Sequence, residues 1–127
     1  MAEFKIKNED LFHFARLNHK AVEEAGLVAF DRTDYLNIVK SGKTKYLVAC
    51  GTSLDGATRD LEAQLSAPVQ ARAVFLAIET NVDLAKGEEI DLTVDSILAA
   101  TDTEAFFWNL YPTPETGYTL HLLINRE

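Results

Sequence analysis

The alternation of apolar and polar positions predicts a strand, a helix and a second strand in the middle of the chain. Residues 46–50 and 73–78 are unbroken apolar runs with the length and residue types of strands buried on both faces. Between them, residues 52–55 have the form of a capping box, and apolar side chains then recur at helical spacing until Pro68, which prevents the helix from continuing. The chain is therefore expected to build a sheet with a helix packed on it.

Similar patterns predict elements on either side of this core. Residues 8–26 and 33–40 carry apolar positions at helical spacing, the second with a cap at Thr33 and a stop at Ser41 and Gly42. Residues 87–100 predict another amphipathic helix. Residues 104–111 and 118–125 have the aromatic or alternating character of strands, and the turn-rich residues that join them predict a hairpin.

The order of these elements predicts an α+β or α/β sandwich. After two N-terminal helices come strand, helix, strand, helix, strand and strand, and right-handed crossovers place both later helices on one face of a four-stranded mixed sheet. We expect a single domain over residues 1–127, with a helical N-terminal extension at 1–42 and the core at 43–127. The strands are apolar on both sides, so the second face of the sheet also needs a cover. Either the N-terminal helices or another subunit would supply it.

Composition narrows the class of protein. A chain of 127 residues that is 47% apolar is long enough for one compact core. With 12 basic and 20 acidic residues, its net charge of -8 argues against binding to nucleic acid or to an anionic membrane surface. There is no signal-like N-terminus and no apolar run long enough for a membrane span, so we expect a cytoplasmic protein. The single cysteine, Cys50, is expected to be a small buried hydrophobe rather than a reactive thiol.

Cofactor and metal chemistry is not indicated. His13 and His19 are too far apart around one helix to share a metal, and His121 lies on a distant strand. The acidic residues between 83 and 95 lack the ligand order of a calcium loop. No closely spaced glycines form a loop that would cradle phosphates. We therefore expect no cofactor, no metal and no nucleotide bound by this chain alone.

Several segments, taken in order, resemble the C-terminal domain of the FtsZ/tubulin family of cell-division GTPases. The resemblance runs from about Thr33 to the end of the chain: a polar stretch that leads into a short helix, a strand that ends in glycine, a helix, a strand, and two later strands. The corresponding segments are residues 33–37, 47–51, 55–62, 65–68, 71–78, 102–107 and 118–125.

This resemblance implies a non-catalytic module for protein binding or self-assembly that lacks the family's GTP-binding domain. In the family, the loop before the short helix reaches into the next subunit of a filament, where its acidic residues help to position the attacking water. Asp34 is the closest match, with Asp31 nearby, so both are candidate catalytic residues acting only in trans. The pattern departs at Asn37, where the family has a second acid, and at Arg32, where it has Asn. Alternatively, Asp31 and Asp34 are helix-starting acids.

Candidate contact residues lie in the same short helix and in the aromatic strand. Tyr35 and Asn37 follow Asp34, and Phe106, Trp108 and Tyr111 belong to a strand with aromatics on both sides. Core packing accounts for one side of that strand, and the other is a candidate interface with a protein partner or a second copy.

A second function remains open. The order of strands and helices is also similar to that of chorismate mutase from bacilli and of small trimeric enamine deaminases, which place active sites between subunits. Such sites use an arginine to grip a carboxylate, and Arg59, Arg72 and Arg126 are the arginines of the core. A small oligomeric enzyme is therefore the alternative.

Overall fold

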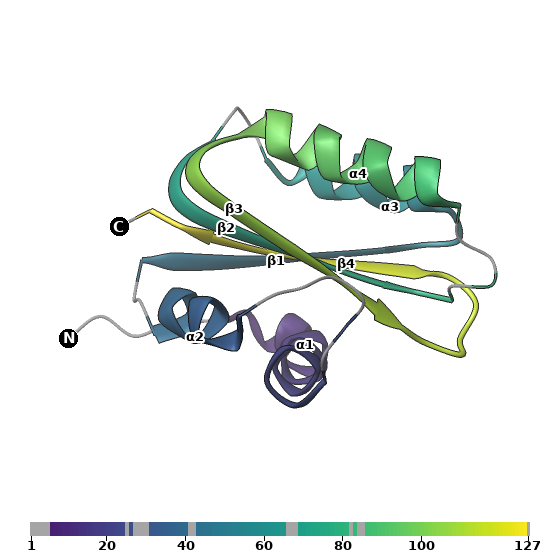
Figure 1. The fold of residues 1–127 in the computed structure, drawn as a ribbon, viewed down its shortest axis with the longest axis horizontal. Coiled ribbons are helices and arrows are strands. Elements are labelled where there is room, and N and C mark those ends of the chain that lie inside the picture. The colour runs from purple at the N-terminus through teal and green to yellow at the C-terminus, as the bar shows by residue number, and fades with distance from the viewer. Residues whose placement is uncertain are drawn as a thin grey trace.

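A four-stranded mixed sheet lies between two layers of helices (Figure 1). The computed structural model describes residues 6–24, 26, 31–40, 43–65, 69–81, 83 and 86–126. The described elements are a 3-10 turn (Asn8–Asp10), α1 (Leu11–Glu23), α2 (Arg32–Lys40), β1 (Thr44–Gly51), α3 (Leu54–Ala63), β2 (Val69–Thr80), α4 (Gly87–Ala100), β3 (Thr101–Pro112) and β4 (Tyr118–Asn125). The predicted order of elements and the predicted fold class are confirmed. The helix stops predicted at residues 41–42 and at Pro68 lie outside the described residues.

The strand order β1-β4-β2-β3 corrects the predicted hairpin. β3 pairs in parallel with β2, whereas β4 lies antiparallel between β1 and β2. After β3, the chain crosses the end of β2, where the Thr113 amide donates to the Thr80 carbonyl at 3.0 Å. The last six residues of β4 are buried, so an interior place satisfies this strand better than an edge.

One half of the core lies between the sheet and the layer formed by α3 and α4. Leu54, Ala57 and Leu61 of α3 are almost without exposure and pack against sheet residues such as Leu76 and Leu122. Ile90 and Ile97 of α4 complete this half. The helical spacing of these positions is the reason that the sequence pattern located both helices correctly.

α1 and α2 cover the second face of the sheet (Figure 1). Leu17 of α1 and Tyr35 of α2 are fully buried in a second apolar cluster with Phe75 and Leu123 of the sheet. The rings of Tyr35 and Phe75 meet edge to face with centroids 5.6 Å apart. The sequence left open whether the N-terminal helices or another subunit cover this face. The N-terminal helices cover it, so burial of the sheet requires no other subunit.

Two helix starts differ by one or two residues from the expected positions. Asp31, rather than Thr33, caps α2, since its carboxylate accepts a hydrogen bond from the Thr33 amide at 2.8 Å. That bond holds the pKa of Asp31 below its ordinary value. Ser53 caps α3 by accepting from the Gly56 amide at 3.0 Å. In both cases the side chain satisfies an amide of the first helical turn.

The position of β1 at an edge of the sheet corrects the expectation for Cys50. β1 has only β4 as a neighbour, and Lys45 and Cys50 are exposed. The middle of the strand is buried on both faces as predicted, since Tyr46 belongs to the cluster under α1 and α2 and Leu47 and Ala49 to the cluster under α3 and α4. The Cys50 thiol lies 3.7 Å from the Thr119 hydroxyl. Cys50 is therefore an exposed residue of an edge strand.

No helix in the described part of the chain has the length and apolar character that crossing a membrane would require.

Candidate functional site

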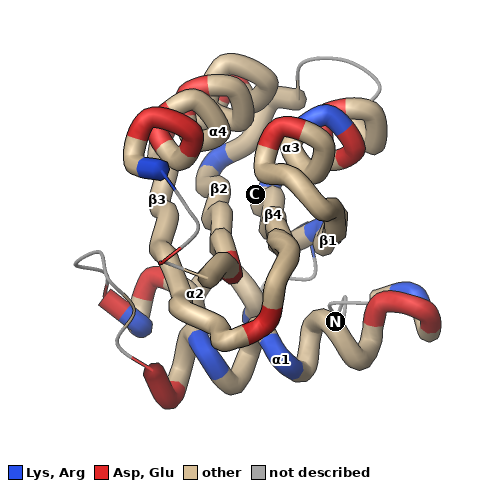
Figure 2. The backbone as a smooth tube through the Cα atoms, turned by 90° about the vertical axis from the view of Figure 1, so that its right-hand side faces the viewer, with Lys and Arg blue, Asp and Glu red and all other residues tan. Residues whose placement is uncertain are grey.

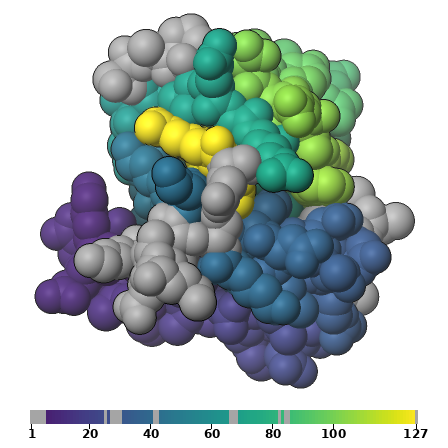
Figure 3. Space-filling model, turned by 90° about the vertical axis from the view of Figure 1, so that its left-hand side faces the viewer, coloured from purple at the N-terminus to yellow at the C-terminus, as the bar shows by residue number. Residues whose placement is uncertain are grey.

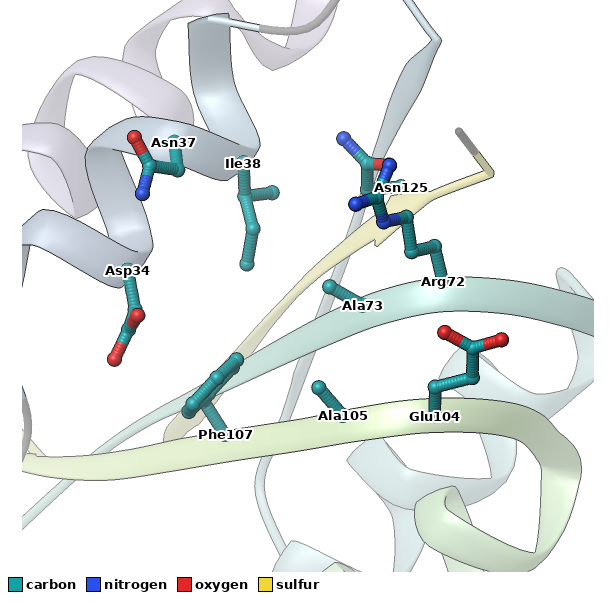
Figure 4. Close-up of a pocket in the computed structure, with 9 residues that line it drawn as sticks. All are labelled: Asp34, Asn37, Ile38, Arg72, Ala73, Glu104, Ala105, Phe107 and Asn125. Atoms are coloured by element: carbon teal, nitrogen blue, oxygen red, sulfur yellow. The ribbon is translucent and has the colours of Figure 1, made fainter.

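An open groove of about 730 Å³ lies between α2 and the sheet (Figure 4). Figure 3 views the end of the molecule at which α2 (blue) meets the first parts of β2 (teal) and β3 (green). The groove has an apolar floor and polar sides. Its lining residues are Asp34, Asn37, Ile38, Arg72, Ala73, Glu104, Ala105, Phe107 and Asn125.

The first turns of α2 supply one side of this groove. Asp34, Asn37 and Ile38 lie on adjoining positions of one helix face, as expected for residues three and four apart. Ile38 is buried and anchors α2 to the sheet, which leaves Asp34 half-buried and Asn37 exposed at the groove. The cap at Asp31 fixes where this helix begins and thus where Asp34 lies.

Charged side chains of opposite sign supply the other side. Arg72 of β2 and Glu104 of β3 lie on neighbouring parallel strands, and Figure 4 shows both side chains rising on the same side of the sheet. Within the described residues, no hydrogen bond or ion pair holds the side chains of Asp34, Arg72 or Glu104. Their charges are therefore free to meet those of a bound molecule.

The groove brings together some of the residues that the sequence suggested and separates others. Asp34 and Asn37 line it, together with Arg72 from the alternative enzyme hypothesis. Asp31 lies at the exposed start of α2 and serves as its cap. This agrees with the alternative that Asp31 is a helix-starting acid. Its role in trans stays a prediction.

Two of the candidate contact residues are core residues in this structure. Tyr35 and Tyr111 have no exposed surface, because α1 and α2 cover the face on which they lie. Tyr35 donates its hydroxyl hydrogen to Asn18 at 3.0 Å, and burial raises the pKa of both tyrosines. They do not offer a surface to a partner in this fold.

Phe106 and Trp108 remain candidates for an interface. Both are half-buried residues of β3, an edge strand, and both pack against the apolar cluster beneath α3 and α4. Phe107, between them, packs against the opposite cluster. The alternation of faces along the strand therefore places aromatics on both sides, as predicted.

A row of hydrogen-bonded polar side chains crosses the sheet on the face that α1 and α2 cover. Tyr46 of β1, His121 of β4 and Glu79 of β2 form a chain of hydrogen bonds: the Tyr46 hydroxyl lies 2.7 Å from His121 Nδ1, and His121 Nε2 lies 2.5 Å from Glu79 Oε2. Arg16 of α1 donates to Glu79 Oε1 at 2.7 Å. Lys20 Nζ is 3.9 Å from the same oxygen. This series of hydrogen bonds and ion pairs therefore links three strands to α1.

The protonation states of these hydrogen-bonded residues follow from their burial and from their hydrogen-bond partners. Burial opposes ionisation of Glu79, but its bonds with His121 and Arg16 outweigh that effect and hold its pKa below the ordinary value. Complete burial lowers the pKa of His121. The imidazole is therefore neutral at neutral pH, with Nε2–H donating to Glu79 and Nδ1 accepting from the Tyr46 hydroxyl. The bond to Glu79 raises the pKa of Arg16.

Sequence reasoning did not connect these residues. His121 was considered only as a metal ligand, and Glu79 only as the end of an apolar run. The available signal was that each is an ionisable residue inside or at the end of an otherwise apolar strand, a position that requires a partner. Among the described residues, no three His, Cys, Asp or Glu side chains are grouped so that they could hold a metal ion.

Comparisons with known proteins give structural matches only. No family model and no curated protein matches the sequence. The fold is similar to a mutant FtsZ of M. jannaschii, with a TM-score of 0.69 and 16% identity, over 95% of this chain and 42% of that one. It is also similar to CetZ from Methanosaeta thermophila (TM-score 0.59, 15% identity, 98% of this chain and 41% of that one).

A third match is a GTPγS-bound protofilament of CetZ2 from Haloferax volcanii, with a TM-score of 0.53 and 12% identity, over 96% of this chain and 42% of that one. The chain thus spans about 42% of the length of the first structures that it matches. The order of elements, the mixed sheet and these matches agree with the resemblance found in the sequence. The chain has the fold of the C-terminal domain of the FtsZ/tubulin family.

Proposed function

We propose that this chain is a non-catalytic module for protein binding or self-assembly, without a nucleotide site of its own, and that the groove beside α2 meets the partner. The observation that carries the proposal is the position of Asp34 and Asn37, the residues singled out from the sequence, on one side of an open groove in this fold. The partner is a second copy or another protein.

The chemistry of the groove supports a protein partner. Its apolar floor, which includes Ala105 and Phe107, suits an apolar side chain, and its sides carry Asp34 and Glu104 as well as Arg72. Interfaces of this kind combine an apolar centre with a polar rim. Two structures with this fold are an FtsZ dimer of M. jannaschii and a CetZ2 protofilament, and these assemblies support self-assembly as one form of the proposed function.

The enzyme alternative loses one of its arguments. Its active sites would lie between subunits, and cover of the second face by another subunit would have favoured it. α1 and α2 of the same chain cover that face instead. Arg72 does line the groove, but acidic Asp34 and Glu104 line it as well, which makes the groove a poor grip for a small anion.

Solution mass tests the proposal first. Light scattering over a concentration series is expected to give a monomer, or assemblies that grow without closing. A discrete closed trimer would instead support the enzyme hypothesis. Arg72→Glu, which reverses a charge in the groove, is expected to change any self-association, whereas Arg59→Glu on α3 should leave it unaltered.

A role of Asp34 in trans has its own test. The protein is added to a GTP-loaded protein that carries the family's GTP-binding domain, and phosphate release is measured. Faster release that is lost in Asp34→Ala supports the proposal. The matched control is Asp55→Ala, because Asp55 is an exposed acid in the first turn of α3. Equal acceleration by wild type and Asp34→Ala contradicts the role of Asp34.

A further inference from the structure

Negative charge is concentrated on the layer formed by α3 and α4. These two helices carry seven acidic residues and one basic residue, Arg59, so they account for -6 of the net charge of -8 (Figure 2). The acidic residues are Asp55, Asp60, Glu62, Glu88, Glu89, Asp91 and Asp95. The rest of the chain is nearly balanced, so the asymmetry belongs to one face of the molecule.

A groove of about 180 Å³, with two leucines among polar and acidic residues in its lining, runs between these two helices. At its base, the hydroxyls of Thr58 and Thr93 are 2.9 Å apart and hold the helices together. Leu54 contributes to the lining, and Leu92 stands at the groove with 66% of its surface exposed. The remaining lining residues are Ser53, Asp55, Glu89 and Ser96. The groove therefore combines an exposed leucine with two acidic residues at its margin, Asp55 and Glu89.

We propose that the outer face of α3 and α4 docks a basic amphipathic segment of another protein. An apolar side chain of that segment would cover Leu92 and enter the groove, and its Lys or Arg residues would face Asp55 and Glu89. The aliphatic stems of Lys and Arg also pack well on such a surface. The field of this layer repels nucleic acid and anionic lipid, and it attracts a basic segment from a distance.

This surface is independent of the groove proposed above. α3 and α4 lie on one face of the sheet, whereas α2 lies on the other (Figure 1). Occupation of one site therefore does not exclude occupation of the other. A partner on the acidic layer would add a second connection to any assembly formed through α2.

The test is a titration of the ¹⁵N-labelled protein with a synthetic amphipathic peptide of Leu and Lys, monitored by amide chemical shifts. The same peptide with Glu in place of Lys is the control ligand. The Lys peptide is expected to shift the amides of α3 and α4 that line the groove, and the Glu peptide to shift none of them. Shifts spread evenly over all acidic surfaces would overturn the proposal.

Leucine variants separate docking from charge attraction alone. Leu92→Ser is expected to weaken binding about fivefold to tenfold, because it removes the apolar contact. Leu98→Ser is the matched control, since Leu98 lies on the same helix, is 44% exposed and is not part of the groove lining. Its effect should stay within about twofold. Equal affinities for both variants would show that charge alone attracts the peptide, and the docking site would be rejected.

Discussion

Glu79 Oε2 lies 2.5 Å from His121 Nε2 in the interior of the sheet, and both side chains are almost completely buried. The two residues come from the adjacent strands β2 and β4, which are distant in sequence. The bonds that Glu79 makes with His121 and, through its other oxygen, with Arg16 of α1 hold its pKa below the ordinary value despite burial. The buried carboxylate of Glu79 therefore has all of its partners only when α1 is docked on the sheet. An ionised carboxylate that is buried without its partners costs several kcal/mol (about 3–5).

Arg16→Ala should destabilise the fold by about 3 kcal/mol, because it leaves the Glu79 carboxylate with a neutral histidine and a distant Lys20 as its partners. Urea unfolding gives the change in free energy. Arg59→Ala is the control, since its ion pair with Asp55 is exposed and contributes at most about 0.5 kcal/mol. Similar losses in both variants would mean that the buried bond to Glu79 adds nothing.

The stability of the protein should fall on mild acidification. His121 has a pKa below its ordinary value of 6.5 when folded, so its contribution is complete above that value. As the pH falls below it, the unfolded chain takes up a proton that the folded chain resists. Glu79 acts in the same direction at lower pH, because its folded pKa also lies below the ordinary value of 4.5.

Thermal unfolding measured at pH values on both sides of 6.5 checks this expectation. Wild type should lose stability as the pH falls through that range. His121→Gln, which keeps polar atoms but cannot titrate, should lose less over the same range. Parallel curves for the two proteins would show that another group causes the acid sensitivity.

Leu17→Ala should cost about 3 kcal/mol, because Leu17 is fully buried between α1 and the sheet. Phe12→Ala on the same helix should change stability by less than about 0.5 kcal/mol, since 72% of Phe12 is exposed. Chemical denaturation of both variants tests whether α1 is an integral cover of the sheet. If Leu17→Ala were as mild as Phe12→Ala, α1 would not be docked as described.

Ser53→Ala should destabilise the protein by about 1 kcal/mol, because the Gly56 amide loses its hydrogen-bond acceptor at the start of α3. Thr52→Ala, one residue earlier, should have almost no effect. Thermal melts of the two variants distinguish the cap that the structure contains from the capping box that the sequence suggested. The reverse order of effects would restore Thr52 as the cap.

The positions of the helices and strands along the chain follow from local sequence patterns. Apolar spacing located the helices that end near Lys40, Ala63 and Ala100, because each buried stripe repeats with the helical period along a short segment. The unbroken run of β2 marked it as an interior strand for a similar local reason. From the order of elements followed the fold class and the resemblance that the structural matches support.

Which elements and side chains become neighbours depends on the three-dimensional packing. β4 enters between β1 and β2 rather than pairing with β3, and no local pattern distinguishes these two arrangements. Because α1 and α2 cover the second face, Tyr35 and Tyr111 became core residues instead of contact residues. Arg16, Glu79 and His121 are far apart in the sequence and meet only after the sheet and α1 pack together. Periodicity is a property of neighbouring positions, whereas partnership across the core depends on strand order and on helix docking.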